Sequence, residues 1–134
     1  MTPATFLDTV GLLAVWDRAD QWHDAADRVF TSLVRSNRIL VTTSLVFVEC
    51  GNAAARTPFR PRVDALRRLF QDDGRLIEPT TEDIDQAWSA YNRGLAGQAG
   101  IVDQVSFVVM RRLGLTQAFT NDVHFRAAGF ETLF

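Results

Sequence analysis

Apolar residues along the chain follow two patterns that alternate. In the first pattern they recur every three or four residues, as from Trp22 to Leu33, which is typical of a helix with one buried face. In the second they form short runs such as the one that begins at Ile39, which is typical of a buried strand. Together the patterns predict strands at residues 5–7, 39–42, 76–78, 117–120 and 131–134, and helices at 11–16, 22–33, 45–56, 59–70, 84–95 and 102–113.

Boundary residues support this alternation and predict the fold class. Thr80 and Asp83 have the spacing of a capping box, and Thr43-Ser44 is suited to cap the helix that follows it. Strands that alternate with helices predict an α/β fold, with a parallel sheet of about five strands and helices on both faces. Because no linker or repeat interrupts the pattern, we expect a single domain over residues 1–134. Ligands of such sheets bind at the carboxyl ends of the strands.

The basic residues narrow the possible chemistry. All 14 are arginines, so mechanisms that need a lysine are excluded: Schiff-base catalysis, a Walker-type phosphate loop, and the phosphatase or receiver sites that use one. The formal net charge of −2 argues against binding nucleic acid through bulk positive charge, although a local basic rim remains compatible with it.

Cysteine usage and the first segment indicate where the protein acts. A single cysteine, Cys50, permits neither an internal disulfide nor a cysteine zinc cluster, which fits a reducing cytoplasm. We interpret it as a core residue, because no orienting pattern joins it to His23 or His124 as a nucleophile. Asp8 and Asp17 interrupt the apolar first segment, so we expect neither a signal peptide nor a membrane span.

Four acidic residues stand in apolar surroundings. They are Asp8, Glu49, Asp103 and Asp122, and burying an unpaired carboxylate costs several kcal/mol. Each has a local explanation. Asp8 is placed to cap a helix, Asp103 to favour a helix dipole, Asp122 to form a turn, and Glu49 to pair with Arg56.

Their positions in the predicted fold favour a shared role. Asp8 and Asp122 each follow a strand, Glu49 lies one turn into the helix after the second strand, and Asp103 opens the helix before the fourth. All four therefore reach the same edge of the sheet. An oxygen-only ligand set without His or Cys suits Mg²⁺ or Mn²⁺ and not zinc. Carboxylate-held Mg²⁺ is suited to phosphodiester hydrolysis.

Four motifs carry a family resemblance. FLDTVGLLA, TTSLVFVEC, IVDQVSFVVMRRLGL and AFTNDVHFRAAGF, in this order, resemble a PIN-domain ribonuclease, and most closely a toxin of the VapBC toxin–antitoxin type. The resemblance covers nearly the whole chain and implies a PIN-like three-layer sandwich. It also implies that Asp8, Glu49, Asp103 and Asp122 bind Mg²⁺ or Mn²⁺ and are catalytic.

Two positions depart from the family pattern. Val10 replaces the serine that usually ends Asp-Thr-Ser, which removes a hydroxyl group from the neighbourhood of the metal site. Asn121 stands where related toxins often carry phenylalanine, which places a different side chain beside the site. Thr9 and Ser44 remain as hydroxyl donors that support the metal ligands.

The first functional hypothesis is a metal-dependent endoribonuclease that hydrolyses RNA phosphodiester bonds. Its RNA would reach the acidic site along arginines. His124 is placed to touch RNA or to polarise the site, although we favour a packing role for it. The second hypothesis, supported by Val10 and Asn121, is a non-catalytic PIN-fold module that binds protein or RNA. The candidate RNA-binding residues are Arg18, Arg56 and Arg126, together with Arg60 and Arg62.

The resemblance also implies protein partners. A ribonuclease of this type has a cognate antitoxin, and we expect a binding groove on apolar helix surface around Trp16, Trp22 and Val46. A homodimer would extend the RNA-binding face. Four aromatic residues on apolar stripes are interpreted as core or dimer surface before any role in base stacking: Trp16, Trp22, Trp88 and Tyr91.

Overall fold

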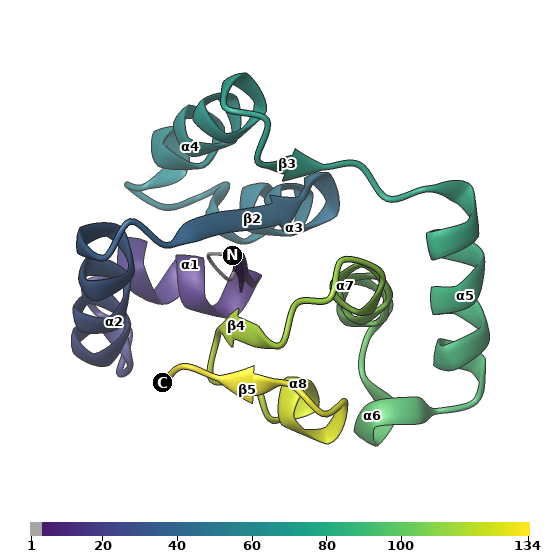
Figure 1. Cartoon of the computed structure of the whole chain (residues 1–134). Helices are drawn as coiled ribbons and strands as arrows, with labels where there is room; N and C mark the ends of the chain where they lie inside the picture. Colours follow the sequence, from purple (N-terminus) through teal and green to yellow (C-terminus); the bar gives the residue numbers. More distant parts are fainter. Residues whose placement is uncertain (1–3) are drawn as a thin grey trace.

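Five parallel strands form the centre of the molecule. The computed structural model describes residues 4–134. The strands lie side by side in the order β3-β2-β1-β4-β5, and every adjacent pair is parallel, as the sequence predicts (Figure 1). Their bounds are Ala4–Leu7 (β1), Ile39–Thr43 (β2), Leu76–Ile77 (β3), Gln117–Phe119 (β4) and Glu131–Thr132 (β5).

Eight helices connect the strands, and all six long predicted helices are among them. Because the strand order reverses direction between β3 and β4, right-handed crossovers place the helices before and after this reversal on opposite faces of the sheet. This is the predicted α/β sandwich. The helices are α1 (Thr9–Trp16), α2 (His23–Arg35), α3 (Ser44–Ala54), α4 (Arg60–Asp72), α5 (Thr81–Asn92), α6 (Leu95–Gln98), α7 (Ile101–Arg112) and α8 (Val123–Ala127).

The register of β1 and β4 aligns their carboxyl ends. These two strands lie at the point in the sheet where the strand order changes direction. Leu7 pairs with Phe119, so the next residues, Asp8 and Thr120, emerge together at one edge of the sheet. A Cβ at Gly11 would lie 2.2 Å from the Phe119 carbonyl oxygen. Glycine therefore lets α1 approach β4 closely, and the start of α1 is held directly over this edge.

At the amino ends of the strands, opposite the acids, polar side chains form hydrogen bonds with one another. Arg38 donates to the Thr5 hydroxyl at 3.0 Å and to the Gln117 side-chain oxygen, and Gln117 donates to Glu131 at 2.6 Å. These bonds connect β1, β4 and β5 to the residue before β2. The amino ends of the strands therefore satisfy their polar groups within the chain.

Two short helices differ from the prediction. The chain forms α6 where Gly94 and Gly97 predict a loop, but Ala96 and Gln98 have left-handed φ angles of 55° and 61°, so this is an irregular turn. The helix α8 has five residues, too few to show helical periodicity in a sequence. The predicted capping box of Thr80 and Asp83 is present at the start of α5.

Burial corrects two expectations about apolar residues. Val46 is fully buried, so it cannot line a surface groove, because Thr43 caps α3 and directs the first turn of the helix into the core. Trp22, Trp88 and Tyr91 are exposed, which excludes the core and leaves the dimer surface of the two alternatives for these residues. On α5, Ala87 is the residue buried against α7, which leaves the two aromatic side chains on the outside.

Two further predictions concern Trp16 and membrane spans. Trp16 is partly buried against the main core, as a residue on an apolar stripe should be. Within residues 4–134, no helix has both the length and the hydropathy needed to cross a bilayer.

Candidate functional site

Asp8 is the most deeply buried acid at the carboxyl edge of the sheet. It caps α1 and is only 1% exposed. Its Oδ2 accepts hydrogen bonds from the Thr120 hydroxyl at 2.8 Å and from the Val10 N–H at 3.4 Å. Its Oδ1 is buried and has no hydrogen-bond partner in the described chain. Burial, followed by the negative charge of Asp103, raises the pKa of Asp8 to about 7.

Thr120 connects two of the predicted acids. Its hydroxyl donates to Asp8 and accepts the backbone N–H of Asp122 at 3.1 Å. The residue is fully buried directly after β4, so this bridge is shielded from water. The sequence interpretation treated Thr120 only as the end of a strand and missed this role. A threonine two residues before Asp122 is the signal that would have indicated it.

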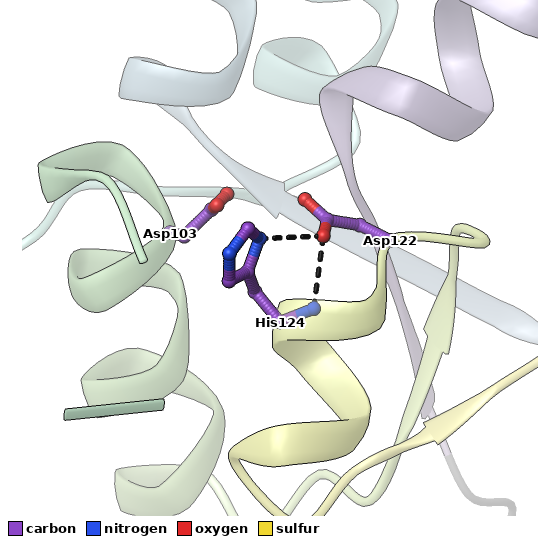
Figure 2. A group of neighbouring side chains, drawn as sticks. All are labelled: Asp103, Asp122 and His124. Atoms are coloured by element: carbon purple, nitrogen blue, oxygen red, sulfur yellow. Dashed lines mark hydrogen bonds and ion pairs between the residues drawn. The ribbon is translucent and has the colours of Figure 1, made fainter. Parts of the chain in front are cut away.

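Asp122 is fixed by the start of α8. Its Oδ1 accepts both the backbone N–H of His124 at 2.9 Å and the His124 ring nitrogen Nδ1 at 2.8 Å (Figure 2). The favoured packing role of His124 is therefore wrong, since the imidazole is half-exposed and bonded to Asp122. The imidazole stands beside two of the predicted acids. Ligand atoms of Asp103, Asp122 and His124 all lie within 4.8 Å of one another.

Asp103 faces Asp122 from the first turn of α7 (Figure 2). Burial raises the pKa of Asp103 to about 6, and the negative charges of Asp122 and Glu49 add to this increase. Glu49 lies on α3, so its electrostatic effect on Asp103 brings a third helix to the cluster. Among the described residues, Asp103 and Asp122 thus lie in one close group with His124, whereas Asp8 and Glu49 lie outside that group and act on its acids through their charge.

The acids also have the local roles in helix starts that the sequence suggests. Asp8 does cap a helix and Asp103 does lie in a first helical turn, while Asp122, expected in a turn, caps α8. A helix that follows a parallel strand begins at the carboxyl edge of the sheet, so its cap belongs to that edge. The alternative for Glu49 fails, because the described chain contains no ion pair between Glu49 and Arg56.

The remaining predicted residues near the site have different surroundings. Thr9 is buried in the first turn of α1, while Val10 beside it is partly exposed. Ser44 opens α3 and lines a cleft with Phe47 and Glu78. Asn121 is half-buried next to Asp122.

Cys50 lies close to the acids but has no chemical role at ordinary pH. Burial raises the pKa of its thiol to about 12, and the charges of Asp8 and Glu49 add to the effect. The group therefore stays protonated and unreactive. This agrees with the prediction that it is a core residue.

The predicted RNA-binding arginines are all exposed, and they lie on different elements of the fold. Arg126 lies on α8, which Asp122 caps. Arg18 follows the far end of α1 and lines a cleft with Phe59 and Arg62. Arg56 follows α3. Of the five predicted arginines, only Arg126 lies on a helix that a residue of the acidic cluster caps.

The donor set fits a divalent cation. Asp8 has a buried oxygen without a hydrogen-bond partner in the described chain, and the pKa values of Asp8 and Asp103 are raised. A bound cation would satisfy that oxygen and favour the charged form of both acids. Carboxylate oxygens are ordinary ligands of Mn²⁺ and of other divalent cations.

Comparisons with known proteins agree on the family and the fold. A family model described as the PIN domain matches residues 5–131. The Mycobacterium tuberculosis 23S rRNA-specific endonuclease VapC20 is 32% identical over 131 residues, covering 93% of this chain and 94% of that protein. The crystal structure of M. tuberculosis VapC20, described as a sarcin–ricin loop cleaving toxin, has a TM-score of 0.81 at 27% identity. It covers 95% of this chain and 96% of its own.

A more distant structure extends the likeness in fold. DNA-bound VapBC from Salmonella typhimurium has a TM-score of 0.62 at 17% identity and covers 98% of this chain and 96% of its own. At this level of identity the likeness concerns the fold alone.

Proposed function

This chain belongs to the PIN domain family, and from this premise we propose that it is a divalent-metal-dependent endoribonuclease, the toxin of a type II toxin–antitoxin system. The observation that carries the proposal is the convergence of Asp8, Glu49, Asp103 and Asp122 with one buried oxygen of Asp8 left without a partner. A chain that only needed to fold would gain stability by losing these charges. Their retention in one place indicates a site that is completed from outside.

Asp8, Asp103 and Asp122 hold the cation, with Glu49 completing the ligand set or positioning water. We propose Mg²⁺ or Mn²⁺, because the site consists mainly of hard carboxylate oxygens. When bound, the cation supplies Lewis-acid chemistry at the scissile phosphate and compensates the charge of the carboxylates. The cluster therefore combines substrate activation with relief of its own repulsion.

The other residues of the site keep the acids in place. Thr120 fixes the Oδ2 of Asp8 and the backbone of Asp122, so two strand ends hold a constant spacing. Thr9 and Ser44 are proposed to support the ligand shell. Arg126 gives α8 an exposed positive charge that attracts the RNA backbone, and Arg18 and Arg56 extend this attraction further from the acids.

Ribosomal RNA is the substrate class we propose. The relative that is 32% identical is a 23S rRNA-specific endonuclease, and its solved structure is described as a sarcin–ricin loop cleaving toxin. The match covers more than nine-tenths of both chains, so no part of the relative large enough to form a separate substrate-binding domain is absent here. Action on ribosomal RNA places the proposed activity in the cytoplasm.

We propose two protein interactions. The first is with a cognate antitoxin, which a ribosome-cleaving toxin requires, at the surface that includes Trp16 and the exposed Trp22. The second is a homodimer formed through the exposed pair Trp88 and Tyr91, whose rings lie 5.2 Å apart on α5. Exposed aromatic side chains that gather on one helix are typical of interaction surfaces.

Cleavage of intact ribosomes by the purified chain tests the proposed activity. With Mg²⁺ or Mn²⁺ we expect a discrete 23S rRNA fragment, and with a chelator none. Asp103→Asn should abolish the fragment, whereas Asp85→Asn, a matched change at an exposed acid on α5, should leave it unchanged. If no RNA is cleaved with either metal, the chain is a non-catalytic binding module.

A further inference from the structure

One oxygen of Asp122 receives two hydrogen bonds from a single residue. The backbone N–H of His124 lies 2.9 Å from Oδ1 of Asp122, and the ring nitrogen Nδ1 lies 2.8 Å from the same oxygen (Figure 2). Because a carboxylate oxygen only accepts, Nδ1 carries the proton in this contact, in the neutral and in the charged ring alike. Oδ2 of Asp122 makes no hydrogen bond within the described chain and is not fully buried. In Figure 2 this second oxygen points toward Asp103.

A strained turn supports the imidazole from another side. A Cβ at Gly97 would lie 3.6 Å from the ring carbon Cδ2 of His124, so the α6 turn flanks the ring. Both residues beside this glycine have left-handed φ angles, 55° and 61°, which cost free energy in residues that carry a Cβ. Gln104, only 2% exposed on α7, donates to the Leu95 carbonyl oxygen at 2.9 Å and anchors the turn. The chain thus retains an unfavourable backbone conformation where it supports the ring.

The needs of the fold do not explain the ring contact. The side chain of His124 is 36% exposed, so the core gains little from it. The start of α8 is already capped, because Asp122 accepts the backbone N–H of His124. A further hydrogen bond at an exposed position adds little stability. What the ring contact adds is orientation, since it directs one oxygen of Asp122 to His124 and leaves the other facing Asp103.

We propose that His124 is a positioning residue, which fixes the carboxyl group of Asp122 so that its Oδ2 is free to bind the cation on the side of Asp103. This inference rests on the metal site of the proposed function. Nδ1 is not itself a ligand, because it carries the proton that Asp122 accepts. Groups that hydrogen-bond to metal ligands restrict the orientation of those ligands, and their loss weakens metal binding by about ten- to a hundredfold.

Two substitutions separate the hydrogen bond from the rest of the ring. In His124→Asn the amide nitrogen takes roughly the place of Nδ1 and still donates to Asp122, whereas His124→Leu has no donor. The dissociation constant for Mn²⁺, measured by calorimetry on the full chain, should rise about tenfold or more in His124→Leu and less than about threefold in His124→Asn. The control is His23→Leu at the other histidine, whose Nδ1 is bonded to the Ala14 carbonyl oxygen, and it should leave the constant unchanged.

The dependence of RNA cleavage on Mn²⁺ concentration gives a second readout. In His124→Leu the concentration for half-maximal rate should rise, and saturating Mn²⁺ should restore most of the rate, because no ligand has been removed. KM for RNA at saturating Mn²⁺ should equal that of wild type. A histidine that acted by contacting RNA would instead raise KM in both His124 variants and leave the Mn²⁺ dependence unchanged.

Gln104→Leu tests the support that α6 gives to the ring. The variant keeps a buried side chain of similar length and removes the donor to the Leu95 carbonyl oxygen. Its dissociation constant for Mn²⁺ should rise, but by less than that of His124→Leu. Combined with His124→Leu it should add nothing, because the turn acts through the ring. Full addition would overturn this link, and His124→Leu alone carries the test if thermal denaturation shows that Gln104→Leu does not fold.

The outcomes distinguish this inference from the proposed function. Unchanged Mn²⁺ affinity in His124→Leu would overturn the positioning role and leave the metal site in place. Equal losses of affinity in His124→Leu and His124→Asn would overturn it as well, since the hydrogen bond would not be the feature that matters. If wild type binds no Mn²⁺ and cleaves no RNA, the proposed function itself fails.

Discussion

Two aspartates of this chain are buried to almost the same extent and have opposite environments. Asp83 is 3% exposed at the start of α5, and Asp8 is 1% exposed at the start of α1. Arg112 donates to both oxygens of Asp83, at 3.0 and 2.7 Å, and the Thr80 N–H donates to one of them at 2.9 Å. The hydrogen bonds from Arg112 hold the pKa of Asp83 below its ordinary value.

Asp8 has only the Thr120 hydroxyl and one long backbone contact, and its charged neighbours are acids. Its pKa is therefore raised to about 7, while that of Asp83 is lowered. The difference teaches that burial alone does not reveal the role of a carboxylate. Asp83 is satisfied inside the chain and stabilises the fold, whereas in the proposed function a bound cation completes Asp8.

The rate of RNA cleavage should show the largest difference between substitutions of Asp8 and Asp83. Asp8→Asn should lower the rate by about 10³-fold or more, the order lost when a group that stabilises the transition state is removed. Asp83→Asn should stay within about twofold of wild type below its melting temperature, since Asp83 bonds only to α5 and Arg112. The measurement is single-turnover cleavage of ribosomal RNA. Equal losses in the two variants would show that the comparison is wrong.

Metal-linked stability should distinguish them next. Mn²⁺ at about 100 times its dissociation constant should add about 2.7 kcal/mol to the free energy of unfolding of wild type. Asp83→Asn should gain as much, because its metal site is intact, and Asp8→Asn should gain little. Thermal denaturation with and without Mn²⁺ measures this. An identical gain in all three proteins would mean that Asp8 does not contribute to metal binding.

The pH dependence of stability follows from the raised pKa of Asp8. Between its ordinary pKa of 3.8 and about 7, the unfolded chain has released the Asp8 proton and the folded chain has not. Asp8 should therefore lower the free energy of unfolding of metal-free wild type by about 2–3 kcal/mol as pH rises from 5 to 8, and Asp103, whose pKa is raised to about 6, adds to the fall. Asp8→Asn should flatten this slope and be more stable than wild type at pH 8.

The comparison at Asp83 predicts the smallest effect. Because its pKa is lowered, Asp83 stabilises the fold at neutral pH and loses this contribution only under acidic conditions. Asp83→Asn should cost about 1–2 kcal/mol through the lost helix cap and charge-assisted bonds. Asp64→Asn, which breaks exposed ion pairs with Arg67 and Arg68, should cost less. Urea denaturation at pH 7 measures both variants.

The members of the site could be predicted where neighbouring residues in the sequence made them unusual. The four acids stood out because their apolar neighbours in the chain are poor surroundings for a charge. Thr120 was missed as a member of the site and His124 was assigned to packing, although each lies two residues from Asp122. Their hydrogen bonds depend on the directions of the chain after β4, which no periodicity encodes.

The sequence by itself determined the strands, the long helices and the acids in apolar surroundings. Periodicity, caps and side-chain polarity are local properties, so they can be read over a few residues. Only the tertiary structure decided which partner each buried carboxylate received. Arg112 reaches Asp83 across 29 residues and Thr120 reaches Asp8 across 112, because helix packing joins the first pair and strand order the second. The free energy of a buried charge depends on those distant neighbours, which is why the pKa of one aspartate is lowered and that of the other is raised.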